Sequence, residues 1–210
     1  MNIVLRIINE NLDLKNQKVL VYLKPQTNNA DWESAAWQAC SPQSGGGSYI
    51  LDAITNEIGA YIESKGGREQ SAYQKIDPKT IAVITQEGNE LVFNPAQLNS
   101  DDAYRLTNTQ SGIKNTTTYP DVFPVWCVNK KTTCRPINPM YNPGFSTFEL
   151  LEKAYFTIGS STSTDTFKVQ NWDELSEIDL PSNLVSADIR AKLDEATNNV
   201  TFTMENPQYV

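Results

Sequence analysis

The sequence contains no histidine in its 210 residues. This absence removes Ser-His-Asp and Cys-His catalysis, zinc sites built on imidazole, and imidazole switches that respond to pH near neutrality. An enzyme without histidine would rely on carboxylates or lysine, so a hydrolase that uses two carboxylates stays open as the last-ranked hypothesis. We therefore expect a protein that is not an enzyme and that needs no cofactor.

Basic residues are few and scattered along the chain. There are 17 Lys and Arg against 25 Asp and Glu, which gives a formal net charge of -8 and a pI near 4.6. The single adjacent basic pair is Lys130-Lys131. Because a phosphate backbone is held mainly by clustered Lys and Arg, this composition predicts that the protein does not bind nucleic acid.

Long hydrophobic runs are also missing. No stretch reaches the roughly 18 consecutive apolar residues of a membrane-spanning helix, so no transmembrane segment is expected. The apolar run near the N-terminus has Arg6 in its middle and no cleavage site of small residues after it, so it predicts a first strand rather than a signal peptide. We expect a cytoplasmic protein, or one exported by a leaderless route.

Cysteine is scarce, with three residues in the chain. If Lys130-Lys131 form the turn of a hairpin, Cys127 faces Cys134 across the two strands, within reach of a disulfide. Two reduced thiols are an equal alternative, since no signal peptide points to an oxidising compartment. Without histidine a zinc site lacks ligands, so no metal is expected. The odd thiol, Cys40, is expected to be buried.

What the sequence does contain is short segments in which apolar and polar residues alternate, separated by turn residues. This pattern predicts an all-β fold, an antiparallel β-sandwich. Gly66-Gly67 and Gly88-Asn89 favour tight hairpins. The expected exceptions are a short helix at 96–102 and a loop at 32–39. The predicted strands are 18–24, 48–54, 57–64, 71–76, 80–86, 90–93, 122–128, 146–151, 154–158 and 166–170.

The segment 186–194 fits both a helix and a strand. It is rich in helix formers, but its apolar and charged residues also alternate strictly. The turn-like 196–199 follows, and then the alternating 200–204, which has a matching period. We therefore predict that this segment is the first strand of a β-hairpin.

A faint internal repeat is visible when Gly47 is set against Gly144 without gaps. This alignment places 51–54 over 148–151, although the identities are few and chance competes as an explanation. If the repeat is genuine, the chain holds two related β halves packed together, at 1–107 and 121–210. Residues 108–120 would then be a polar linker or a long loop, and a single compact domain is the alternative.

The four tryptophans divide into two classes by their neighbours. Trp37 and Trp126 lie in apolar contexts and are expected in the core. Trp32 and Trp172 each stand beside an acidic residue, and exposed rings among polar side chains are typical of a sugar-binding platform. The simpler interpretation is that they too are packing residues.

Two functions from different classes follow from these observations. The first is a structural or self-associating β-sandwich protein that forms a homo-oligomer, favoured by Thr- and Asn-rich strands with few guarding lysines. The alternative is a lectin-like or toxin-like module that binds glycans or a cell surface through Trp32, Trp172, Asp173 and Glu174. The last two residues are also the candidate carboxylates if the protein is a hydrolase, and no catalytic residue stands out.

Overall fold

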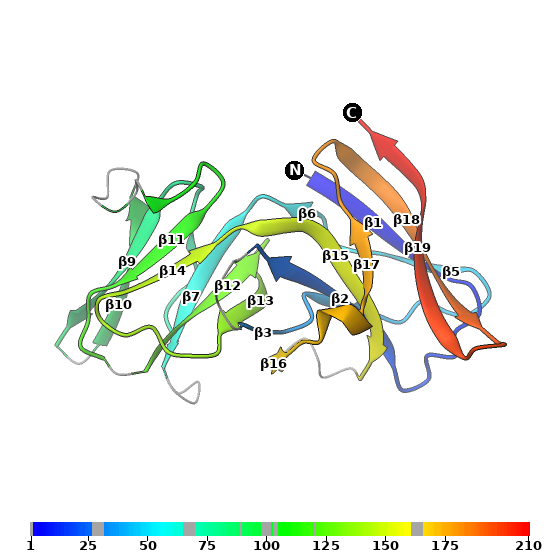
Figure 1. Cartoon of the computed structure of the whole chain (residues 1–210), viewed down its shortest axis with the longest axis horizontal. Helices are drawn as coiled ribbons and strands as arrows, with labels where there is room; N and C mark the ends of the chain where they lie inside the picture. Colours follow the sequence, from blue (N-terminus) through cyan, green and yellow to red (C-terminus); the bar gives the residue numbers. More distant parts are fainter. Residues whose placement is uncertain are drawn as a thin grey trace. The chain divides into compact units, whose positions relative to one another are not determined.

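The computed structural model describes residues 2–26, 32–64, 70–88, 90–97, 102, 105–119, 121–160 and 166–210. Regular structure in this part of the chain is nearly all β (Figure 1), with the short 3-10 helix η3 (Trp172–Glu174) as an addition. Several antiparallel sheets pack together, so the all-β, sandwich-like prediction is confirmed.

The chain forms two compact units. Unit 1 comprises 1–24, 34–56 and 151–210, and unit 2 comprises 25–33 and 57–150. Each unit takes strands from both of the stretches 1–107 and 121–210.

Unit 1 contains two sheets. The first has the strand order β19-β18-β1-β5, with β6 also paired to β1, and the second has the order β17-β15-β2-β4. Phe156 of β15 and Phe202 of β19 stack with ring centroids 5.5 Å apart, so the two sheets enclose a shared core. The strands are β1 (Asn2–Asn9), β2 (Lys18–Pro25), β4 (Gln38–Cys40), β5 (Gly47–Ile50), β6 (Ile54–Thr55), β15 (Leu150–Gly159), β17 (Ser176–Asp179), β18 (Leu184–Asp194) and β19 (Asn199–Tyr209).

The C-terminal segment forms the predicted hairpin rather than a helix. β18 and β19 pair antiparallel from Asp194↔Asn199 inward. Ile189 and Ala191 point into the core with no exposed surface, while Arg190 between them is partly exposed on the opposite face. Helix propensity is overridden because strict alternation buries one whole face of a strand.

Unit 2 also contains two sheets. The first has the order β10-β9-β11-β14, and the second runs β3-β13-β12-β7-β8. Trp126 of β12 stacks on Phe148 of β14 at 5.3 Å and is fully buried, as predicted for a core residue. The strands are β3 (Trp32–Ser34), β7 (Ile58–Ser64), β8 (Gln74–Lys75), β9 (Ile81–Glu87), β10 (Glu90–Gln97), β11 (Ser111–Asn115), β12 (Val122–Val128), β13 (Lys131–Pro136) and β14 (Gly144–Phe148). The remaining named strand, β16 (Lys168–Val169), lies in the stretch 151–210 of unit 1.

Three local expectations differ from the structure. The segment 108–120, expected as a linker or long loop, contains β11, whose Ile113 is fully buried. The short polar sequence of β11 hides this role, because its burial comes from strands on both sides. The expected loop at 32–39 contains β3 and the start of β4, and the expected helix at 96–102 begins within β10, while 98–101 lie outside the described residues.

Two predicted hairpin turns have different outcomes. Gly88 has φ +63° and joins β9 to β10, whose ladder starts at Glu87↔Glu90, so this turn is confirmed. Gly66-Gly67 lie outside the described residues.

Candidate functional site

The two neighbouring cysteines do not face each other as the sequence predicted. Cys127 pairs with Thr132 and Cys134 pairs with Trp126, and the ladder between β12 and β13 shifts by one residue between these two pairs. A β-bulge of this kind places two residues of one strand opposite one residue of the other. The expected cross-strand pairing of Cys127 with Cys134 is therefore wrong.

The turn of this hairpin explains why Cys127 pairs with Thr132. Val128 pairs with Lys131, so the turn residues are Asn129 and Lys130, with φ +51° and +63°. Two consecutive positive φ values define a type I′ turn, in which asparagine is favoured at the first position. The tight turn is therefore set by Asn129, one residue earlier than Lys130-Lys131.

All three thiols are buried and free in the structure. Burial raises the pKa of Cys40 and of Cys127 to about 12, and it also raises the pKa of Cys134. A buried thiol that stays protonated is a poor nucleophile and a poor metal ligand. Among the described residues, no group of three or more Cys, Asp or Glu side chains could hold a metal ion.

Trp172 is half-buried and belongs to an aromatic cluster in unit 1, which we define as Tyr22, Tyr155 and Trp172 with Lys24. The Trp172 ring meets Tyr155 edge-on at 4.8 Å and Tyr22 at 6.4 Å. The Lys24 Nζ lies 5.2 Å from the Trp172 ring centroid and 5.8 Å from that of Tyr155, within cation–π range. Sequence reasoning did not include Lys24, because only the folded sheet brings it over these rings.

The polar side of the aromatic cluster is organised around Glu177. Its carboxylate accepts a hydrogen bond from the Tyr155 hydroxyl at 2.9 Å and pairs with Lys153, which also reaches Asp179 at 3.4 Å. Lys153 and then Tyr155 lower the pKa of Glu177, while burial followed by Glu177 raises the pKa of Tyr155. Glu177 is thus held as a structural carboxylate that ties β17 to β15.

The other predicted binding residues lie apart from these contacts or on a separate unit. Asp173 and Glu174 are exposed in η3, and Glu174 accepts a hydrogen bond from Asn171 at 2.7 Å. Trp32 is half-buried at the start of β3 and belongs to unit 2, whereas Trp172 belongs to unit 1. The candidate residues therefore divide between the two units.

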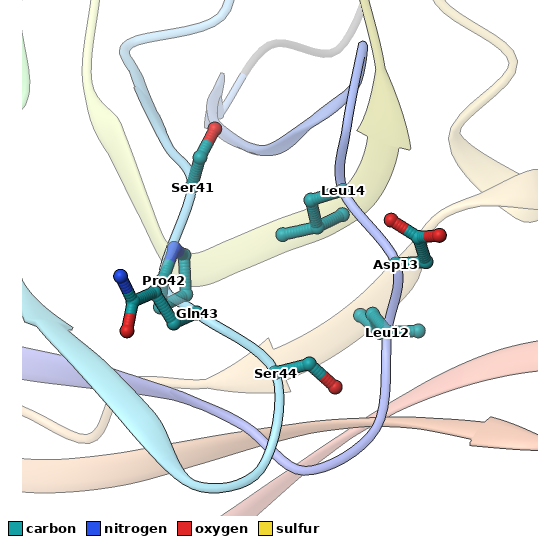
Figure 2. A pocket seen from close by; sticks show the side chains of 7 residues that line it. All are labelled: Leu12, Asp13, Leu14, Ser41, Pro42, Gln43 and Ser44. Atoms are coloured by element: carbon teal, nitrogen blue, oxygen red, sulfur yellow. The ribbon is translucent and has the colours of Figure 1, made fainter.

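A shallow hollow of about 430 Å³ opens in unit 1 between the loop after β1 and the loop before β5. Figure 2 shows Leu14 directed toward the opposite wall, where Ser41 and Pro42 lie, while the Asp13 carboxylate points away. Asp13 pairs with Lys15 at 2.9 Å, which lowers the pKa of Asp13. The lining offers hydroxyl and amide groups but no pair of facing carboxylates.

The sheet β19-β18-β1-β5 ends in an exposed strand on each side. Within the described residues β19 is the last strand on one side, and its alternate residues from Asn199 to Thr203 are exposed. At the other side, β5 carries Tyr49 and Ile50, which are 46% and 63% exposed. Neither strand has a lysine or arginine, the residues that most often protect an edge from pairing with another chain.

Charges on the outer face of the same sheet are paired within the chain. Arg6 holds Asp188 with two hydrogen bonds of 2.7 Å, and Arg190 holds Glu205 in the same two-pronged way. Glu10 pairs with Lys192 at 2.7 Å and with Arg190 at 3.4 Å. The alternation in the sequence of β18 predicted that its charged residues face outward, but it did not predict which residues they pair with.

Within the described residues, none of the helical segments has the length and apolar character needed to span a membrane. Comparisons with protein-family models, with curated proteins and with solved structures find no match to this chain.

Proposed function

We propose that this protein is a structural, self-associating β-sandwich protein that assembles by adding strands at the edge of the sheet β19-β18-β1-β5. The observation that carries the proposal is the edge strand β19, which is eleven residues long and contains no lysine or arginine. Its single acidic residue, Glu205, is already bound by Arg190. Such an edge offers its outer backbone groups to a second strand.

The partner that fits this edge best is the same strand of a second copy. Two antiparallel β19 strands related by a two-fold axis can pair the outer backbone N–H and C=O groups of each with those of the other. Two-fold symmetry of this kind is the commonest symmetry of homodimers. The regular part of β19 runs from Asn199 to Glu205, because the ladder is interrupted between Glu205 and Gln208. β5 offers only four residues and is the weaker edge.

The experiment compares the mass of the wild type with that of the double variant Thr201→Glu/Thr203→Glu by light scattering over a range of concentrations. Both threonines are exposed and lie opposite Lys192 and Arg190. In the monomer, each new carboxylate therefore faces a positively charged side chain across the strands. Across a β19–β19 contact they would place like charges together, and the dimer should dissociate.

The matched control is Ala196→Glu/Thr197→Glu, which adds the same charge in the exposed turn before β19. We expect this control to assemble as the wild type does. A wild type that stays monomeric at high concentration, or an edge variant with unchanged mass, would contradict the proposal. Negative-stain microscopy of the wild type would show whether assembly continues beyond the dimer.

A second function, glycan binding, is favoured by one specific observation. The half-exposed Trp172 ring stands next to the exposed carboxylates of Asp173 and Glu174, an arrangement that suits stacking on a sugar with hydrogen bonds to its hydroxyls. Asp173→Asn should then weaken binding on a glycan array while the fold is kept. Wild-type protein that binds no glycan on the array would remove this alternative.

A further inference from the structure

The first sheets of the two units have the same strand order and the same directions. In unit 1, β5 is antiparallel to β1, β1 is parallel to β18, and β18 forms a hairpin with β19. In unit 2, β14 is antiparallel to β11, β11 is parallel to β9, and β9 forms a hairpin with β10. A parallel pair inside otherwise antiparallel sheets is a specific feature, and it occurs at the same place in both.

The second sheets match as well. Read in the same direction, the strand orders are β4-β2-β15-β17 in unit 1 and β13-β12-β7-β8 in unit 2. The outer pairs β2–β4 and β12–β13 are both antiparallel, as are β15–β17 and β7–β8. The strands outside this correspondence are β3, β6 and β16.

The correspondence extends to single residues. Asn9 pairs with Gly47 at the end of β1, and Asn115 pairs with Gly144 at the end of β11. Both ladders then continue without a shift. The β1–β5 ladder is followed by the hydrogen bond from the Leu51 N–H to the Leu5 carbonyl, and the β11–β14 ladder reaches the pair Ser111↔Phe148. The gapless alignment of Gly47 with Gly144 that the sequence suggested is therefore the register that the two sheets share.

The equivalent asparagines, Asn9 and Asn115, make the same kind of hydrogen bond. Each is fully buried and donates a hydrogen bond from Nδ2 to a backbone carbonyl in the loop before the glycine strand. Asn9 donates to Pro42 at 2.8 Å, and Asn115 donates to Met140 at 2.6 Å. A buried amide that fixes the same loop in both units is not required by strand alternation, so its recurrence supports a repeat.

The paired glycines are also required for the same reason. A Cβ atom on Gly47 would collide with the backbone carbonyl of Gln43, and one on Gly144 would collide with the backbone carbonyl of Tyr141. Each loop thus folds back closely on the first residue of its strand.

The hairpins β9–β10 and β18–β19 also share a feature. Both ladders are interrupted beside an Asn-Pro pair, Asn94-Pro95 in β10 and Asn206-Pro207 in β19.

The equivalent strands do not follow the boundaries of the compact units. Apart from β3, β6 and β16, the strands from β1 to β10 (2–97, the first copy) correspond in chain order to those from β11 to β19 (111–209, the second copy). Unit 1 is built from the start of the first copy and the end of the second, whereas unit 2 is built from the end of the first and the start of the second.

We infer that the chain is a tandem duplication whose two copies have exchanged halves, so that each copy is the binding partner of the other and neither compact unit exists without both. The contact surfaces are the parallel ladders β1–β18 and β9–β11, together with the neighbours β2–β15 and β12–β7. This is the arrangement of a domain-swapped dimer, joined into one chain by the segment between β10 and β11.

The test is a cut between the copies in the folded full-length chain. A recognition sequence for a specific protease is inserted between Asn108 and Thr109, which are both exposed, and a scrambled insert of equal length serves as the uncut control. After cleavage, the two fragments should stay together at the mass of the uncut chain, since each unit is held by strands from both. Unfolding in urea should then depend on protein concentration, because two separate fragments must meet to refold.

Fragments that separate without denaturant into two folded particles, each with strand-type circular dichroism, would overturn the inference. A cleaved chain whose unfolding midpoint does not change with concentration would overturn it as well. Both readouts compare cut with uncut protein under the same conditions, so they are independent of whether β19 mediates self-association.

Discussion

Asn9 and Asn115 lie at equivalent ends of two strands in different sheets, and each joins its strand to the loop that leads into the neighbouring strand. Asn9 also accepts a hydrogen bond from the Leu12 N–H at 2.7 Å, and Asn115 accepts one from the Thr117 N–H at 2.9 Å. Each side chain therefore satisfies backbone groups of two separate loops at a position without solvent access. A buried amide with all its partners in place strongly specifies one arrangement of the chain.

Replacing either asparagine by alanine should lower the free energy of unfolding by about 1–3 kcal/mol, because buried backbone groups lose their partners. The matched control is Asn108→Ala, whose side chain is exposed and should matter by less than about 0.5 kcal/mol. Urea unfolding followed by tryptophan fluorescence and circular dichroism measures both. Equal stability of Asn9→Ala and the control would contradict the role given to this residue.

The two glycines should tolerate no side chain. Gly47→Ala and Gly144→Ala would each force a Cβ into a backbone carbonyl, and such overpacking typically costs about 1–3 kcal/mol. Ser48→Ala, one residue further along the exposed strand β5, is the control and should be nearly neutral. The measurement is the thermal midpoint of each variant, and a Gly47→Ala midpoint equal to that of Ser48→Ala would show that the loop relaxes freely.

Acid should weaken unit 1 through Asp188. Arg6 and then Asn206 hold the pKa of Asp188 below its ordinary value. A carboxylate whose pKa is lower in the folded state stabilises the protein above its unfolded pKa of about 3.9, and this contribution is lost as the pH falls through the folded pKa.

We therefore expect Asp188→Asn to lower stability at neutral pH and to reduce the further loss between about pH 5 and about pH 2. The measurement is denaturant unfolding at a series of pH values, with the exposed Asp173→Asn as control. If the free energy of unfolding of Asp188→Asn depends on pH as steeply as that of the wild type, other carboxylates are responsible for the pH dependence.

The three thiols should not react with a thiol reagent in the native protein. With Cys40 and Cys127 at pKa values of about 12 and Cys134 raised as well, a thiol reagent at about pH 8 should react with none of them before unfolding. In guanidinium without reductant, all three should react. A count of one thiol under those conditions would establish a bond between two of the three cysteines.

Much of the fold was predictable where the information is local. Alternation identified most strands, and the turn residues at Gly88 and the matching periods at 186–194 and 200–204 gave the two long hairpins. Local signals were weakest where tertiary contacts decide burial. β11 is short and polar and was expected as a linker, yet it lies at the centre of its sheet because strands on both sides supply its partners.

The candidate sites show the same division. The apolar surroundings of Trp37 and Trp126 predicted their burial, which the structure confirms. The turn at Asn129-Lys130 lies one residue earlier than expected and moves the partner of Cys127 from Cys134 to Thr132, a change that needs only local geometry but was missed because two lysines looked like the turn. Lys24 over Trp172 could not be foreseen, because these residues belong to strands and loops far apart in the sequence.

The sequence by itself determined that this chain is a β protein and where many of its strands lie, and it suggested the alignment of Gly47 with Gly144. Those properties follow from side-chain period and from backbone conformations that act over a few residues. Only the tertiary structure decided that β1 pairs with β18 and β9 with β11, so that the halves of two copies are exchanged. The pairing of distant strands depends on which faces can be buried together once the whole chain collapses, and no local pattern records that choice.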